Sequence, residues 1–160
     1  VVSAVSGAVP EEFVVGIRIS QSMVTDYGYV WPKGEDAAAV FFERLSTAGA
    51  DYIHTTERDA TASTFGEDGP SLAKAAKIYS VPDTVVIANG GLGTPAVARE
   101  SLGDAADLVT LGRRALANPD WPHRVATGAD LAEFDRTSRL KPEASISEEE
   151  LSLDVPPAEK

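Results

Sequence analysis

The sequence predicts an α/β fold made of repeated strand–helix units, on the basis of three observations. Short apolar runs bounded by turn residues are typical of strands buried on both faces of a parallel sheet. Segments of helical periodicity alternate with these runs, which indicates parallel strands joined by right-handed helical crossovers. Four such units make half of a (β/α)8 TIM barrel. The expected strands lie near residues 13–19, 51–55, 84–88 and 107–111.

Length and charge limit the kind of protein this is. The 160 residues suit one domain but fall short of the roughly 200 that a complete barrel needs. The first residue is Val1 rather than methionine, so we expect a processed product, an expressed fragment or part of a longer polypeptide. The net charge of −11 argues against nucleic acid and against an anionic membrane as partners.

Several functional classes are excluded by residue types that the chain lacks. It has no cysteine, and therefore no disulfide, thiolate metal site or cysteine nucleophile, and we predict no metal site. No apolar stretch reaches the roughly 18–20 residues that span a bilayer, and residues 1–9 lack the basic flank of a signal peptide. We expect a soluble, cytoplasmic protein.

The first strand carries one charge in an otherwise apolar run. Residues 1–9 are typical of the end of a helix closed by Pro10, and the strand Phe13–Ile19 follows. Arg18 lies near its carboxyl end, and an arginine is costly to bury without a partner. Because barrel active sites gather at the carboxyl ends of strands, Arg18 is a candidate ligand-binding residue. A salt bridge across the barrel rim is the alternative.

The loop after this strand is rich in aromatic residues. Gln21–Gly34 contains Tyr27, Tyr29 and Trp31, which suit a wall over a planar ligand. A loop that packs its own aromatic side chains together is the alternative.

Two helices are expected to cover the sheet. The first begins at Glu35 or Asp36 and ends at Gly49, and the second begins at Pro70. The core-facing positions expected in the first helix are Ala37, Val40, Phe41, Leu45 and Ala48. Those expected in the second helix are Leu72, Ala75, Ala76 and Tyr79.

A histidine lies near the carboxyl end of the second strand. An imidazole ordinarily titrates near neutrality, so a role of His54 in ligand contact or catalysis is one interpretation, and a hydrogen-bonded structural role is the other. The loop Arg58–Gly69 that follows is long for this kind of connection, and such loops on the functional face are often functional.

Two glycine-bearing loops follow the third and fourth strands. These are Asn89-Gly90-Gly91 and Gly112-Arg113. Glycines let backbone N–H groups approach an anion, and a helix capped by Thr94 with Pro95 in its first turn adds a positive end. Arg113 adds a forked, permanently charged donor. Together the loops predict a phosphate site; glycines that only make tight turns are the alternative.

The order of several motifs resembles the old yellow enzyme family of FMN-dependent NAD(P)H:flavin oxidoreductases. The matching pieces are GIRIS at 16–20, GADYIH at 49–54, ANGG at 88–91, ADLVTLGR at 106–113 and ANPDWPHR at 117–124. They resemble the carboxyl-terminal half of such an enzyme, strands five to eight. Residues 1–135 would form that half of an FMN-binding TIM barrel, and residues 136–160 an acidic, poorly ordered tail.

The resemblance implies cofactors and residue roles. Arg18 would lie against the pyrimidine edge of FMN, where it stabilises the negative charge of the reduced flavin. Gly90 and Gly91 would contact the FMN phosphate, and Gly112 with Arg113 would complete the clamp. Hydride would pass from NAD(P)H through FMN to an activated alkene or enone.

The resemblance also implies what this chain lacks. The family's histidine or asparagine pair and its tyrosine proton donor belong to the amino-terminal half, so the catalytic residues here are unknown. That missing half is an expected partner, and unpaired strand edges favour association, including a homo-oligomer. The alternatives are a non-redox aldolase or isomerase that binds a sugar phosphate, and a non-catalytic half-barrel that assembles with another chain.

Overall fold

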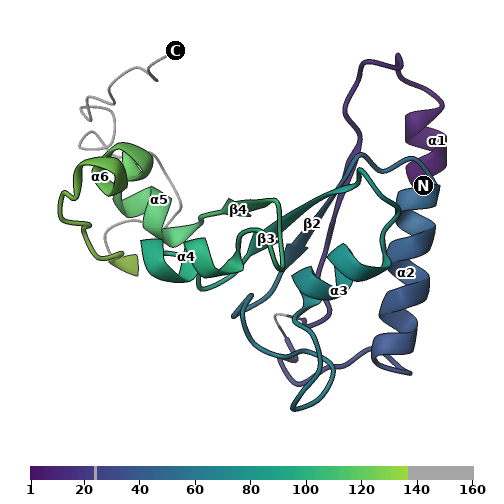
Figure 1. Cartoon of the computed structure of the whole chain (residues 1–160), viewed down its shortest axis with the longest axis horizontal. Helices are drawn as coiled ribbons and strands as arrows, with labels where there is room; N and C mark the ends of the chain where they lie inside the picture. Colours follow the sequence, from purple (N-terminus) through teal and green to yellow (C-terminus); the bar gives the residue numbers. More distant parts are fainter. Residues whose placement is uncertain (24, 137–160) are drawn as a thin grey trace. The chain divides into compact units, whose positions relative to one another are not determined.

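The computed structural model describes residues 1–23 and 25–136, which form two compact units divided between Thr110 and Leu111 (Figure 1). The strands are β1 (Gly16–Ile19), β2 (Tyr52–Thr56), β3 (Val85–Asn89) and β4 (Leu108–Thr110). The helices of the first unit are α1 (Val2–Ser6), α2 (Glu35–Thr47), α3 (Leu72–Tyr79) and α4 (Pro95–Ser101). The second unit contains α5 (Arg113–Ala117) and α6 (Trp121–Thr127).

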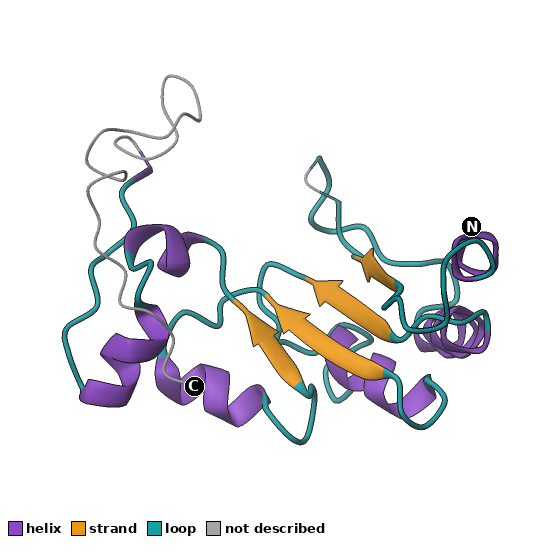
Figure 2. Ribbon diagram, turned by 90° about the horizontal axis from the view of Figure 1, so that it is seen from above, coloured by secondary structure: helices purple, strands orange, loops and turns teal. Residues whose placement is uncertain are grey.

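All four strands belong to one parallel sheet in the order β1-β2-β3-β4, and their arrows point the same way in Figure 2. The predicted α/β fold with four strand–helix units is therefore confirmed, and sequential parallel order is the arrangement of a TIM barrel. The expected strand at 13–19 is shorter than predicted, because pairing begins only at Gly16, opposite Tyr52.

The two faces of the sheet differ. Ile53 of β2, with Val86 and Ala88 of β3, is fully buried on the face that α2 and α3 cover. The alternate residues form the other face, where Arg18, His54, Ile87 and Leu108 lie in register across the four strands. This second face brings polar residues of neighbouring strands together.

The core of the first unit lies between the sheet and helices α2 and α3. The expected face of α2 is wrong by one position, since Val40 and Phe41 are exposed while Ala38 and Phe42 are buried. Helical periodicity indicates that α2 has an apolar stripe. It does not show which residues lie at the centre of the stripe, because apolar residues also lie just beyond its edge. The buried residues of α3 are Leu72, Ala73, Ala75 and Ala76, which confirms three of the four expected positions.

The start of one helix and the capping of another differ from those predicted. Helix α3 begins after Ser71, whose side chain accepts the N–H of Lys74, rather than at Pro70. Helix α4 does begin at Pro95, but the Thr94 side chain makes no capping hydrogen bond.

An aspartate before each of two strands forms a pair of hydrogen bonds with the neighbouring strand segment. Asp51 precedes β2 and exchanges two hydrogen bonds with Val15, since each backbone N–H donates to the other residue, at 2.7 Å. Asp107 precedes β4 and makes the equivalent pair with Val86, at 2.8 and 2.9 Å. A carboxylate that accepts a backbone N–H fixes the register at which neighbouring strands begin.

Replacing Asp107 by asparagine should lower the free energy of unfolding by about 0.5–1 kcal/mol at neutral pH. The hydrogen bond from Lys77, and then that from the Val86 N–H, hold the pKa of Asp107 below its ordinary value. Such a carboxylate stabilises the fold above its unfolded-state pKa, and the contribution disappears as pH falls through the folded-state pKa. Its side chain is 36% exposed, so solvent screening keeps the effect small.

Urea denaturation at neutral pH and at about pH 2–3 measures this difference. Asp104→Asn is the matched control, because Asp104 also pairs with a lysine but is 72% exposed. We expect the Asp107→Asn difference to shrink at low pH and the control to change little at either. A difference that persists undiminished in acid would contradict the role of the carboxylate charge.

In the described part of the chain, no helix has the length and apolar character needed to cross a membrane. Within the same residues, no cluster of His, Asp or Glu side chains is arranged to hold a metal ion. The expected tail at 136–160 lies outside the described residues except for Arg136.

Candidate functional site

The predicted flavin-facing arginine lies at the carboxyl end of β1. The side chain of Arg18 is exposed, and its Nη2 atom donates to Oγ1 of Thr56 at 3.0 Å. The same atom lies 3.5 Å from Oδ1 of Asn89. Both partners are neutral, so neither hydrogen bond offsets the positive charge of the guanidinium. This arrangement differs from the salt bridge of the alternative interpretation.

His54 lies beside Arg18 in the register of β1 and β2. Its Nε2 atom is 2.9 Å from Oγ1 of Thr110, and that hydroxyl lies 3.4 Å from the Ala88 carbonyl. Burial lowers the pKa of His54, and the positive charge of Arg18 lowers it further. His54 is therefore hydrogen-bonded, as in the structural interpretation, and its surroundings favour the neutral imidazole.

Glu57, in the loop after β2, connects the loop after β1 to the end of β3. Its carboxylate accepts the backbone N–H of Gln21 at 2.9 Å and the hydroxyl of Ser22 at 2.8 Å. Its own N–H donates to the carbonyl of Asn89 at 3.0 Å. The sequence shows a glutamate after a strand but not these partners, so this connecting residue was missed.

The first glycine loop packs closely against the loop after β2. Gly90 has φ +129°, and a Cβ there would lie 2.1 Å from the carbonyl oxygen of Glu57. The Gly90 carbonyl also accepts the N–H of Ala60 at 3.0 Å. Glycine is therefore required at this position for a structural reason.

Gly91 has a different environment. It has φ +70°, and a Cβ there would meet no atom nearer than 3.7 Å. Within the described residues, the N–H groups of Gly90 and Gly91 donate to no partner. Backbone N–H groups without a partner near a helix start can donate hydrogen bonds to an anion.

Gly112 and Arg113 belong to the second unit, at the start of α5. A Cβ at Gly112 would meet nothing within 4 Å, and Arg113 is exposed. The neighbouring Arg114 is engaged instead, since it donates to Ala132 at 3.1 Å and pairs with Glu133 at 2.9 Å. A clamp formed by both glycine loops stays a prediction.

A buried asparagine organises the second unit. Asn118 is 1% exposed, and its Nδ2 atom donates to the carbonyls of Arg114 and Ala132, both at 3.0 Å. Its Oδ1 atom accepts the Ala132 N–H at 2.7 Å. The asparagine of the ANPDWPHR motif thus has a structural role that sequence reasoning did not assign.

The aromatic side chains Trp31 and Tyr27 of the loop after β1 contact residues outside that loop. Trp31 makes an edge contact with Phe41 of α2, with ring centroids 4.9 Å apart, and lies 6.4 Å from Phe65. Tyr27 is exposed, and Arg58 lies over its ring at 5.9 Å. Trp31 therefore packs on α2 and on the loop after β2 rather than on the other aromatic residues of its own loop, and Tyr27 is exposed beside Arg58.

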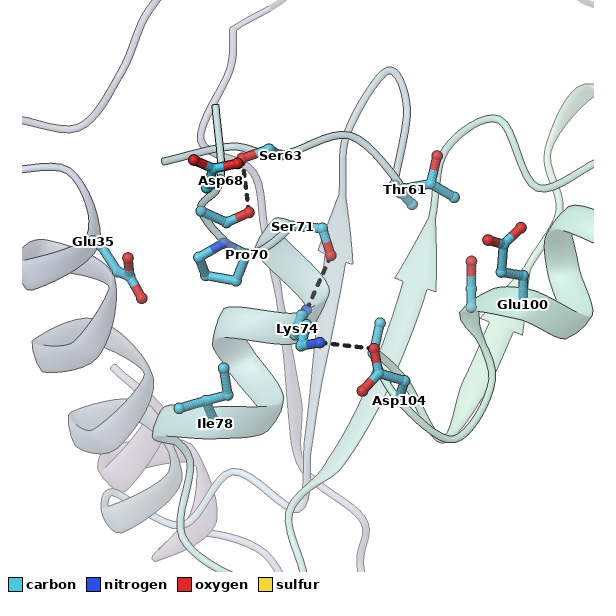
Figure 3. A pocket seen from close by; sticks show the side chains of 14 residues that line it. Glu35, Thr61, Ser63, Asp68, Pro70, Ser71, Lys74, Ile78, Glu100 and Asp104 are labelled. Carbon is cyan, nitrogen blue, oxygen red and sulfur yellow. Dashed lines mark hydrogen bonds and ion pairs between the residues drawn. The ribbon is translucent and has the colours of Figure 1, made fainter. Parts of the chain in front are cut away.

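A groove of about 480 Å³ lies elsewhere in the first unit (Figure 3). Its walls come from α3, α4 and the loop that precedes α3, and Lys74 pairs with Asp104 across it at 2.8 Å. Arg18, Gly90 and Gly91 are not among the residues that line it. The groove is thus separate from the predicted cofactor site.

Comparison with known proteins gives one family. Residues 1–132 match the profile of the NADH:flavin oxidoreductase / NADH oxidase family. The chain is 29% identical over 136 residues to the NADH:fumarate oxidoreductase of Klebsiella pneumoniae (strain 342). That alignment covers 81% of this chain and 14% of the relative.

Solved structures agree with this assignment. The chain is similar to morphinone reductase in complex with tetrahydroNAD, with a TM-score of 0.66 and 28% identity over 86% of this chain and 35% of that one. An old yellow enzyme homologue from Zymomonas mobilis gives a TM-score of 0.58 and 25% identity over 74% of this chain and 32% of the homologue. The chain thus spans about a third of the length of these structures.

Proposed function

The chain belongs to the NADH:flavin oxidoreductase / NADH oxidase family, and from this premise we propose that it is the FMN-binding part of an ene-reductase-like oxidoreductase. Membership confirms the resemblance to old yellow enzymes and the TIM-barrel fold class. It also confirms FMN and a nicotinamide as the cofactors of the family. The activated alkene substrate, and the residues that bind FMN, belong to our proposal.

The observation that supports this function most is that a cation and backbone donors lie at one end of one sheet. Arg18 reaches Asn89, and Asn89 directly precedes the Gly90-Gly91 loop, whose N–H groups donate to no partner among the described residues. Phosphate accepts hydrogen bonds from such a loop, and the pyrimidine edge of a reduced flavin carries negative charge that a fixed cation stabilises. The residues present therefore fit FMN.

In the proposed site each residue has a defined task. Gly90 and Gly91 hold the phosphate, and Gly112 with Arg113 completes its clamp. Arg18 faces the flavin ring and favours its reduced form. When bound, FMN supplies hydride transfer from NAD(P)H to an activated alkene, and the protein orients the reactants.

We propose that the active site is completed by residues of an amino-terminal barrel half. Strands β1 and β4 are the outer strands of the sheet, so each presents one edge that a further strand could pair with. A second copy of this chain is the competing occupant of these edges. Size measurement of the chain alone and with a candidate amino-terminal half distinguishes the two.

An aldolase or isomerase using the same phosphate loops fits less well. Such enzymes need a lysine or a carboxylate at a strand end. Glu57 is the carboxylate after β2, and its oxygens are already engaged by Gln21 and Ser22. We therefore retain the oxidoreductase as the single proposed function.

The test is flavin binding. We expect the protein, purified together with its amino-terminal half, to be yellow and to release FMN on denaturation. Lys74→Ala, in the separate groove, is the control and should leave FMN binding unchanged. A colourless protein that cannot be reconstituted with FMN would contradict the proposed function.

A further inference from the structure

The side chain of Asn89, the last residue of β3, lies at the centre of a hydrogen-bond network beneath the proposed flavin site. Its Oδ1 atom accepts the hydroxyl of Thr56 at 3.0 Å and lies 3.5 Å from Nη2 of Arg18. Its Nδ2 atom donates to the backbone carbonyl of Thr110, on β4, at 3.0 Å. Asn89, on β3, therefore connects Arg18 on β1 to the neighbouring strands β2 and β4.

These contacts determine the orientation of the amide. Because Nδ2 is used by the Thr110 carbonyl, Oδ1 must face Thr56 and Arg18. The Thr56 hydroxyl donates its hydrogen to Asn89 and accepts one from Arg18, so the two side chains hold the guanidinium together. A long arginine side chain loses rotamer freedom when it is held in this way, and at least one acceptor is needed to offset that cost.

The chemical character of these acceptors matters for the charge of Arg18. An aspartate at position 89 could accept the same hydrogen bonds, but its negative charge would offset the guanidinium charge that the flavin senses. A leucine would have a similar size without any acceptor. An amide orients the arginine and leaves its charge available.

We propose that Asn89 is a positioning residue that orients the Arg18 guanidinium toward the flavin without neutralising it. The inference rests on the proposed function, because it assigns Arg18 to the flavin ring. It concerns the ratio of the affinities for reduced and oxidised FMN rather than FMN affinity itself. A general loss of stability lowers both affinities and leaves their ratio unchanged.

The first experiment measures this ratio through the midpoint potential of bound FMN. We expect Asn89→Leu to lower the preference for reduced FMN about tenfold, equivalent to a midpoint potential about 30 mV more negative. Asn89→Asp, which keeps the acceptor but adds a negative charge, should lower the preference as well. Arg18→Leu is the positive control and should lower it at least as much.

Thr110→Val is the matched control. It removes the hydroxyl that contacts His54 and the Ala88 carbonyl but keeps the backbone carbonyl that Asn89 uses. We expect it to leave the potential unchanged. If both Asn89 variants leave the potential unchanged while Arg18→Leu lowers it, Asn89 does not position the arginine. If Arg18→Leu also has no effect, the flavin-facing role of Arg18 fails and the inference fails with it.

The second experiment needs no cofactor. The chain has two histidines, and the positive charge of Arg18 contributes to lowering the pKa of His54. NMR titration of the full chain should show a higher pKa of His54 in Arg18→Leu and in Asn89→Leu, because the first removes the guanidinium and the second removes an acceptor that holds it in place. An increase in Arg18→Leu without any increase in Asn89→Leu would overturn the positioning role even if FMN binding were never observed.

Discussion

Replacing Arg113 by alanine is expected to weaken FMN binding by about 1.5–3 kcal/mol, a loss of roughly 10- to 150-fold in affinity. In the proposed clamp Arg113 makes a charge-assisted contact with the phosphate, which alanine cannot replace. Its side chain is exposed at the start of α5, so little stability should be lost with it. Titration of the apoprotein with FMN, followed by flavin fluorescence, measures the change.

Arg114→Ala is the control for this prediction. It removes the same charge one residue along the chain, but Arg114 is engaged by Ala132 and Glu133 within the second unit. We expect lower stability of that unit and a much smaller change in FMN affinity than for Arg113→Ala. Equal affinity of the Arg113→Ala protein and the original would remove Arg113 from the site.

The order of the strands could be predicted because each is a short apolar run between turn residues. Strands β2 and β3 lie within one residue of the expected bounds, whereas β1 begins later. Phe13 and Val14 are apolar but exposed. The hydrogen bonds between Asp51 and Val15 precede the pairing of β1 with β2, which begins only beyond Phe13 and Val14. A hydrogen bond between residues 36 positions apart leaves no local signal in the sequence.

The candidate site shows the same division between local and distant information. Arg18 could be selected because a charge in an apolar run is locally unusual. Asn89 and Glu57 could not be assigned roles, because their partners come from other strands and loops and depend on strand register. Gly90 was selected as a phosphate contact, but its sequence neighbours do not indicate the close approach of Glu57.

Replacing Gly90 by alanine is expected to destabilise the fold by about 2–5 kcal/mol and to abolish FMN binding. The new Cβ would lie 2.1 Å from the Glu57 carbonyl oxygen and 2.8 Å from its carbon, and these backbone atoms cannot rotate away. The φ of +129° adds backbone strain for any residue with a side chain. Relief requires the loops after β2 and β3 to separate, which displaces the N–H groups proposed to hold the phosphate.

Gly103→Ala is the control that shows the effect of backbone strain without a steric clash. Gly103 also has a positive φ, +87°, but a Cβ there would meet no atom within 4 Å. It should therefore cost only about 1–2 kcal/mol of stability and leave FMN affinity unchanged. Urea denaturation and FMN titration of both variants provide the comparison. If the two alanine variants were equally stable and bound FMN equally well, the contact between the Gly90 loop and Glu57 would not be needed for the site, and the phosphate would have to be held by other groups.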